Sequence, residues 1–118
     1  MHHGKKKAQK FGRLRGQRIS FIRNLGNDLI RVGGIETTEA RAKAIRPRVE
    51  RLVSFAKRGT VAARREVLSR VDNARIAKKL MEEYGPRYKD RNGGYLRIMK
   101  LGKVRKRDAT RMVRIEFV

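Results

Sequence analysis

Hydrophobic residues recur at helical spacing through the first two thirds of the chain. The first stripe consists of apolar side chains three or four positions apart, namely Ile19, Ile22, Leu25 and Leu29. This period predicts a helix over residues 18–32, which Gly33-Gly34 ends. The next residues, 35–37, favour a short strand.

A second helix is predicted between residues 38 and 58. Thr37 or Thr38 can accept hydrogen bonds from its first free amides, and Gly59 can end it. Pro47 lies inside this helix, where it removes one backbone donor and crowds the preceding turn. The helix is therefore expected either to bend at Pro47 or to consist of two shorter pieces.

Two more helices are predicted after short breaks in the pattern. Thr60 is expected to cap the third helix, and Asp72 or Asn73 is expected to cap the fourth. Gly85-Pro86 is expected to end the fourth helix, because both residues are poor helix formers.

After Gly94 the hydrophobic period changes to two residues. The alternating apolar positions are Leu96, Ile98, Val113, Ile115 and Phe117. This alternation predicts two antiparallel strands joined by a basic loop over residues 102–110. The order helix, strand, three helices and two strands predicts a two-layer α+β fold with helices on one face of the sheet. We expect one such domain over residues 19–118, preceded by a basic arm, residues 1–18.

The charge balance indicates the class of partner. The chain has 118 residues, with 33 lysines and arginines against 11 aspartates and glutamates, and a formal net charge of +22. Self-repulsion of this size opposes compaction unless a polyanion neutralises it, so the expected partner is nucleic acid. The absence of cysteine removes disulfides, thiolate catalysis and cysteine-ligated zinc. The apolar runs are too short to span a membrane.

Three basic segments are predicted to bind RNA: the arm, residues 85–98 and the loop 102–110. The arm has too little apolar surface to offset the entropy of ordering, so we expect it to order along phosphates. The alternative for the arm is a solvated tail that only improves solubility, and the alternative for the loop is a solvated hairpin tip. The predicted RNA-binding residues are Lys5, Lys6, Lys7, Lys10, Arg13, Arg15, Arg18, Arg87, Lys89, Arg91, Arg97, Lys103, Arg105, Lys106 and Arg107.

Residues 85–98 have two interpretations. Gly93-Gly94 would let backbone amides approach a phosphate, while Tyr88 and Tyr95 offer faces on which bases could stack. The same residues fit an ordinary helix-to-strand connection, with Gly85 as the C-cap and both tyrosines packed in the core. The surrounding positive charge favours RNA contact for the arginines and leaves the tyrosines open.

Arginines on the second and third helices lie off the apolar stripes. A solvated position and an RNA contact are equally expected for each of Arg41, Arg48, Arg51, Arg58, Arg64 and Arg65. Two helical ion pairs are also predicted, because Glu39 precedes Lys43 by four residues and Glu66 precedes Arg70 by four.

Candidate catalytic groups are few. His2 and His3 are the only imidazoles, and no carboxylate lies near them in the sequence. Glu82-Glu83 is the only adjacent carboxylate pair, and neighbours on a helix point in different directions. No phosphate-binding loop of the nucleotide-hydrolase type is present. We therefore expect a protein that is not an enzyme and has no cofactor, metal site or small-molecule substrate.

Several motifs together resemble a known family. They are Arg23-Asn24-Leu25, Thr37-Thr38, Gly85-Pro86-Arg87-Tyr88, Gly93-Gly94-Tyr95-Leu96-Arg97-Ile98 and Ile115-Glu116-Phe117. The region with these motifs spans residues 13–118. In the order and spacing of the motifs, the chain resembles the family of the seventeenth protein of the bacterial large ribosomal subunit. The resemblance implies an α+β domain with a three-stranded mixed sheet. It also implies binding to large-subunit ribosomal RNA near the peptide exit tunnel, beside neighbouring ribosomal proteins, in a cytoplasmic or organellar ribosome. The alternative from another class is a small basic protein that compacts DNA.

Overall fold

The computed structural model describes the backbone of residues 15–118 and the side chains of residues 16–118. The predicted contacts of Lys5, Lys6, Lys7, Lys10 and Arg13, and that of the Arg15 side chain, lie outside the described residues. The elements in chain order are α1 (Arg15–Val32), β1 (Gly34–Thr38), α2 (Glu39–Arg58), α3 (Val61–Val71), α4 (Ala74–Lys79), the π-helical segment η1 (Leu80–Tyr84), α5 (Gly85–Arg87), β2 (Leu96–Val104) and β3 (Arg111–Phe117).

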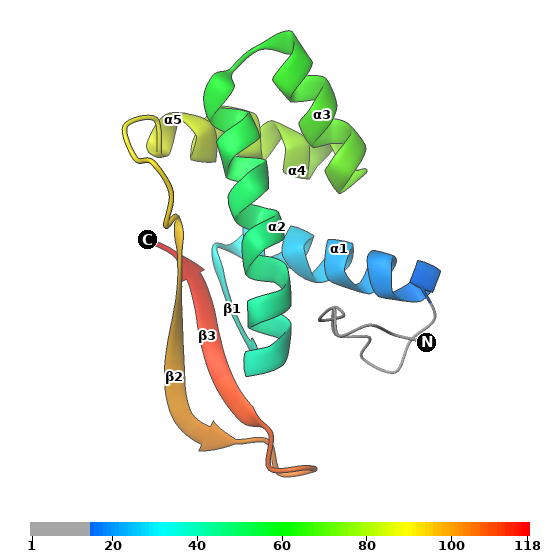
Figure 1. The fold of residues 1–118 in the computed structure, drawn as a ribbon, viewed down its shortest axis with the longest axis vertical. Helices are drawn as coiled ribbons and strands as arrows, with labels where there is room; N and C mark the ends of the chain where they lie inside the picture. The colour runs from blue at the N-terminus through cyan, green and yellow to red at the C-terminus, as the bar shows by residue number, and fades with distance from the viewer. Residues whose placement is uncertain (1–14) are drawn as a thin grey trace, which may run out of the picture.

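The three strands form one antiparallel sheet in the order β1-β3-β2 (Figure 1). The mixed sheet that the family resemblance implied is therefore wrong. β1 and β2 run in the same direction, but β3 lies between them and pairs antiparallel with both, so no parallel ladder forms. The register aligns Ile35 and Ile98 with Ile115 on one face of the sheet.

Helix α2 is the central element of the helical layer. It packs against α1, α3, η1, α5 and all three strands, and Figure 1 shows it crossing one face of the sheet. Its buried residues, at helical spacing, are Ala42, Ile45, Val49, Leu52, Val53 and Ala56. They meet Val113, Ile115 and Phe117 of β3 in a single hydrophobic core. The predicted two-layer α+β fold is confirmed.

Local side-chain chemistry sets the starts of the helices as predicted. The side chains of Thr38, Thr60 and Asn73 accept hydrogen bonds from the first free amides of α2, α3 and α4. The alternative cap Asp72 instead ends α3 in a left-handed conformation. Helix α2 continues through Pro47 as one helix of 20 residues, so the prediction of two shorter pieces is wrong.

The helical segment does not end at Gly85-Pro86, contrary to the sequence prediction. It passes from α4 through η1 into α5 and reaches Arg87, and Gly85 has a right-handed helical φ of −56°. Gly85 is buried, and a Cβ atom there would lie 2.7 Å from the carbonyl oxygen of Ala56. The glycine therefore permits close packing against α2 and does not act as a helix stop.

Tyr84 connects this helical segment to the sheet and to α1. Its ring stacks on Phe117 with a centroid distance of 4.1 Å, and its hydroxyl donates to the carbonyl of Ile30 at 2.9 Å. Burial, with a smaller effect from nearby Glu83, raises the pKa of Tyr84 to about 12. The phenol is therefore held neutral well above its ordinary titration range.

Gly85→Ala is expected to lower the free energy of unfolding by about 1–3 kcal/mol, because the added methyl group overlaps the Ala56 carbonyl and forces the two helical segments apart. Urea denaturation followed by circular dichroism measures this change. Gly16→Ala is the control, since no atom lies within 4 Å of a Cβ there. Equal stability of the Gly85→Ala variant and the wild type would contradict the packing role.

Stability at alkaline pH should depend on Tyr84. The unfolded chain loses this phenolic proton near pH 10, while the folded chain holds it to about 12, so the free energy of unfolding falls as pH rises through this window. Below pH 10 the contribution is fully present. Tyr84→Phe should reduce this slope by up to about 1.4 kcal/mol per pH unit, leaving the part due to Tyr88, whose pKa is also raised by burial. An unchanged slope between pH 10 and 12 in urea titrations would contradict this account.

Candidate nucleic-acid interface

The predicted RNA-binding residues of the folded domain lie at two separate ends of the sheet. The loop after Val104 forms the tip of the β2–β3 hairpin, and the segment 87–95 lies where β2 begins (Figure 1). The nine residues of β2 place these ends about 30 Å apart. The residues that the sequence grouped by charge therefore form two clusters and not one patch.

An internal ion pair shapes the hairpin tip. Arg105 donates from Nε and Nη2 to the two carboxylate oxygens of Asp108, at 3.1 and 2.6 Å, and Asp108 also accepts from the amide of Thr110. These hydrogen bonds hold the pKa of Asp108 well below its usual range. Lys106 and Arg107, by contrast, are exposed and have no ion-pair partner within residues 16–118. Arg105 therefore orders the loop, while Lys106 and Arg107 remain free to meet an anion.

The outer face of the sheet carries paired charges. Glu116 accepts from Arg97 at 2.8 Å and from Arg114 at 2.9 Å, and these two guanidinium groups lower its pKa. Lys103 pairs with Glu36 at 3.1 Å. Arg97 and Lys103 are still more than half exposed, at 55% and 60% of their side chains. Both predicted residues therefore keep donors facing solvent, although a carboxylate already offsets their charge.

The two tyrosines of residues 85–98 belong to the core. Tyr88 and Tyr95 are 4% and 2% exposed, and their ring centroids lie 5.1 Å apart. The hydroxyl of Tyr88 donates to the carbonyl of Val118, and Lys57 donates to the hydroxyl of Tyr95 at 2.9 Å. The structure thus decides between the two interpretations: neither tyrosine face is available for stacking on a base.

The basic residues of this segment surround an open turn. Gly93 and Gly94 have φ values of +129° and +62°, which confirms the predicted glycine turn. Arg87 donates to the backbone carbonyl of Val118 at 2.8 Å, and Arg91 donates to the carbonyl of Gly93 at 3.2 Å.

These contacts position the two guanidinium groups. Lys89 is also exposed, and no Asp or Glu side chain among the described residues pairs with Arg87, Lys89 or Arg91. Arg18, on the first turns of α1, is half-buried and likewise has no ion-pair partner among the side chains that the structure describes.

The arginines of α2 and α3 divide into held and free groups. Arg41 lies over the ring of Phe21, while Arg58 and Arg70 lie over Phe55. The predicted pairs Glu39–Lys43 and Glu66–Arg70 are confirmed, at 3.0 and 2.7 Å. On α2 and α3, the exposed arginines with no ion-pair partner in the described part of the chain are Arg46, Arg51, Arg64 and Arg65, besides Arg58 over Phe55; Arg75 of α4 is also exposed and unpaired there. The sequence prediction does not include Arg46 and Arg75, because no local sequence pattern shows that an arginine will be exposed and lack an ion-pair partner.

Among residues 16–118, no group of three His, Asp or Glu side chains is placed to hold a metal ion. None of the described helices is long and apolar enough to cross a membrane.

Comparison with known proteins identifies the family. A family model described as "Ribosomal protein L17" matches residues 21–118. The chain belongs to the ribosomal protein L17 family. The large ribosomal subunit protein bL17 of Persephonella marina is 50% identical over 113 residues, which cover 95% of this chain and 91% of that protein. The protein of the same name from Thermoanaerobacter sp. is 46% identical over 110 residues, covering 93% of this chain and 97% of its own. That of Hydrogenobaculum sp. is 44% identical over 118 residues, covering 100% of this chain and 99% of its own.

The match confirms the family resemblance drawn from the sequence motifs. Within the L17 family fold, Arg97 and Ile115-Glu116-Phe117 lie on paired strands, so motifs from two distant segments meet in one sheet. The residues Gly85-Pro86-Arg87-Tyr88 lie at the end of the helical segment that packs on α2. Many of the family motif residues therefore stabilise the fold. The cations without ion-pair partners lie around these motif residues.

Proposed function

We propose that this chain is a structural component of the large ribosomal subunit, binds ribosomal RNA and lies near the peptide exit tunnel. Family membership and the names of relatives of nearly the same length support a place in the large subunit, in the cytoplasm. The position near the exit tunnel and the contact with neighbouring ribosomal proteins are supported by the motif resemblance. The binding residues are argued from charge and geometry.

The observation that carries the proposal is the placement of cations without carboxylate partners at both ends of a rigid sheet. Lys106 and Arg107 lie at one end, and Arg87, Lys89 and Arg91 lie about 30 Å away at the other. Phosphates of separate RNA helices occur at such separations in a folded RNA, whereas a solvated tail needs no fixed spacing. The protein acts as a spacer that binds two RNA segments together.

Affinity and specificity come from different parts of this arrangement. Each free cation that meets a phosphate releases condensed counterions, and this release supplies most of the binding free energy. Arginine forks also bind phosphate oxygens in pairs, which fixes orientation. Arg97, Lys103 and Arg105 are held by Glu116, Glu36 and Asp108, so they present a fixed shape to the RNA. The arm residues are expected to add further phosphate contacts.

Sucrose-gradient sedimentation tests the assignment directly. The full chain is expected to sediment with large subunits at low ionic strength and to leave them as salt rises, because phosphate contacts weaken with salt. Ribosomal RNA should compete for the free chain better than duplex DNA at equal phosphate concentration. Sedimentation only as a free species would contradict the proposal, and equal competition by duplex DNA would favour the DNA-compacting alternative.

Charge-matched variants test the assigned residues in the same assay. Lys106→Gln with Arg107→Gln removes two free cations, and Lys43→Gln with Lys78→Gln removes two that pair with Glu39 and Glu82. The first pair should reduce the slope of log affinity against log salt by about 0.7–0.9 per lost contact, and the second should change it little. Equal slopes for the two double variants would show that pairing does not decide which cations bind RNA.

A further inference from the structure

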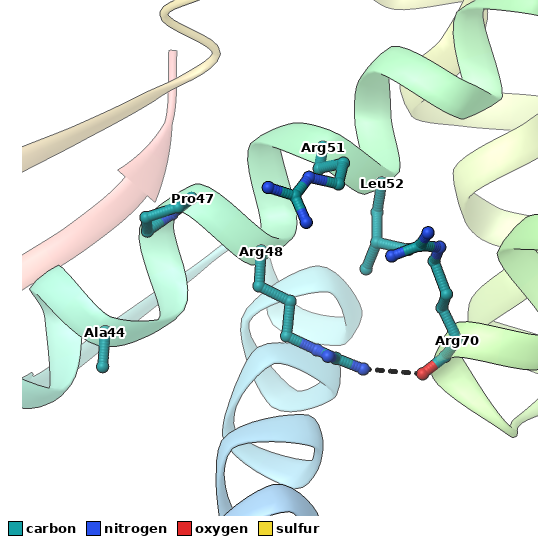
Figure 2. Close-up of a pocket in the computed structure, with 6 residues that line it drawn as sticks. All are labelled: Ala44, Pro47, Arg48, Arg51, Leu52 and Arg70. Atoms are coloured by element: carbon teal, nitrogen blue, oxygen red, sulfur yellow. Dashed lines mark hydrogen bonds between the residues drawn. The ribbon is translucent and has the colours of Figure 1, made fainter. Parts of the chain in front are cut away.

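A pocket lies between the middle of α2 and the end of α3. Its volume is about 230 Å³, and it is lined by Ala44, Pro47, Arg48, Arg51, Leu52 and Arg70. Figure 2 shows that the first five of these residues come from one side of α2, at spacings of three and four residues, and that Arg70 comes from α3. Three arginines thus share one pocket whose other walls are apolar.

Arg48 is fixed at the α3 side of the pocket. Its Nη2 donates at 2.7 Å to the carbonyl of Arg70, one of the last carbonyls of α3 (Figure 2). This contact satisfies a helix end that lacks internal partners and offsets its partial negative charge. Burial, then the nearby charges of Arg23 and Arg70, lower the pKa of Arg48. The surroundings of Arg48 therefore disfavour its positive charge, and an anion in the pocket would relieve that cost.

The other guanidinium groups keep donors available. Arg70 uses Nε to bind Glu66 at 2.7 Å and lies over the ring of Phe55, so its position is fixed while its terminal nitrogens stay free for further bonds. Arg51 is exposed and has no hydrogen-bond or ion-pair partner in residues 16–118. Arg51 can therefore turn toward a ligand without breaking an existing contact.

Positive charge exceeds negative charge around the pocket. Arg23, whose charge acts on Arg48, lies 3.8 Å from the carboxylate of Asp72, and its buried Nε has no hydrogen-bond partner among the described residues. Within residues 16–118, the ion pairs of these four arginines are Arg23 with Asp72 and Arg70 with Glu66. This excess of positive charge is local. The carbonyl of Arg70 near the end of α3, which accepts a hydrogen bond from Arg48, offsets only part of it.

We propose that this pocket binds one phosphate group through Arg48, Arg51 and Arg70. The volume is below that of pockets that take drug-sized ligands and suits a single small group. Planar guanidinium forks from two helices can bind phosphate oxygens from two directions. The apolar walls, Ala44, Pro47 and Leu52, add no competing negative charge. The natural source of the phosphate is the RNA backbone, an identification that rests on the proposed function, whereas free inorganic phosphate is the other source of the same chemistry.

The RNA source is tested with Arg51→Gln in the full chain. Arg51 makes no contact that holds the fold, so the variant should stay folded, which circular dichroism verifies. The slope of log affinity for ribosomal RNA against log salt should fall by about 0.7–0.9, the value of one phosphate contact. Lys78→Gln, which removes a cation outside the pocket that pairs with Glu82, should change the slope less. Arg51→Lys keeps the charge and should restore the slope but not the full affinity, because lysine lacks the fork.

Inorganic phosphate tests the pocket without RNA. Titration of the full chain with phosphate against chloride at matched ionic strength, followed by amide NMR spectra, should shift the signals around Arg48, Arg51 and Arg70 most. Arg51→Gln should remove these shifts and Arg65→Gln should keep them. Shifts spread evenly over all basic helices, or shifts that survive Arg51→Gln, would overturn the pocket assignment.

The two arms also separate this inference from the proposed function. If the wild type binds ribosomal RNA and Arg51→Gln binds with the same salt slope as Lys78→Gln, the pocket assignment is wrong while the proposed function stands. If the wild type binds inorganic phosphate at the pocket but does not sediment with large subunits, the proposed function is wrong and the phosphate site stands.

Discussion

The scarcity of carboxylates governs this molecule. With 33 basic and 11 acidic side chains, cations outnumber carboxylates three to one, so the placement of each carboxylate determines which cations are held and which stay free. Glu116 holds Arg97 and Arg114 on the sheet, and Asp108 holds Arg105 in the hairpin tip. Each exposed pair contributes little stability by itself. Its effect is to fix a guanidinium group at a defined place beside cations that remain unpaired.

The hydrophobic core makes that placement rigid. Helix α2 contacts every strand, and the close packing at Gly85 brings the α4–α5 segment onto it. Tyr84 and Phe117 join this segment to the sheet, and Tyr88 and Tyr95 complete the same cluster. Leu96 at the start of β2 belongs to the core, and β2 pairs with β3 as far as Val104, so the two basic clusters lie at opposite ends of one paired strand. Rigid spacing of charges is what a protein needs to recognise the shape of a folded RNA.

Local features of the fold were predictable from the sequence. Helix caps such as Thr60 and Asn73 and helical ion pairs such as Glu66–Arg70 depend on residues within one turn of each other. The role of Gly85 was not predictable, because the carbonyl that it approaches is 29 positions away along the chain, at Ala56.

The binding residues show the same division. Charge runs indicated the hairpin loop and the segment before β2, but no run distinguishes Lys106 from Arg105. Pairing across strands, as between Arg97 and Glu116, follows from the sheet register, and the pocket arginines meet only when α2 packs against α3. The sequence alone places Ala44, Pro47, Arg48 and Arg51 on one side of a helix. For Arg70, the sequence predicts only the ion pair with Glu66. Tertiary contacts therefore decide which charges are free.

The central claim is that, at the two ends of the sheet, the cations without carboxylate partners meet RNA phosphates. Lysine acylation followed by mass spectrometry, on the free chain and on assembled large subunits, measures this residue by residue. Lys89 and Lys106 should lose reactivity on assembly, while Lys43 and Lys78, which face Glu39 and Glu82, should keep theirs. Unchanged reactivity of Lys89 and Lys106 in the subunit, or equal protection of all four lysines, would contradict the account.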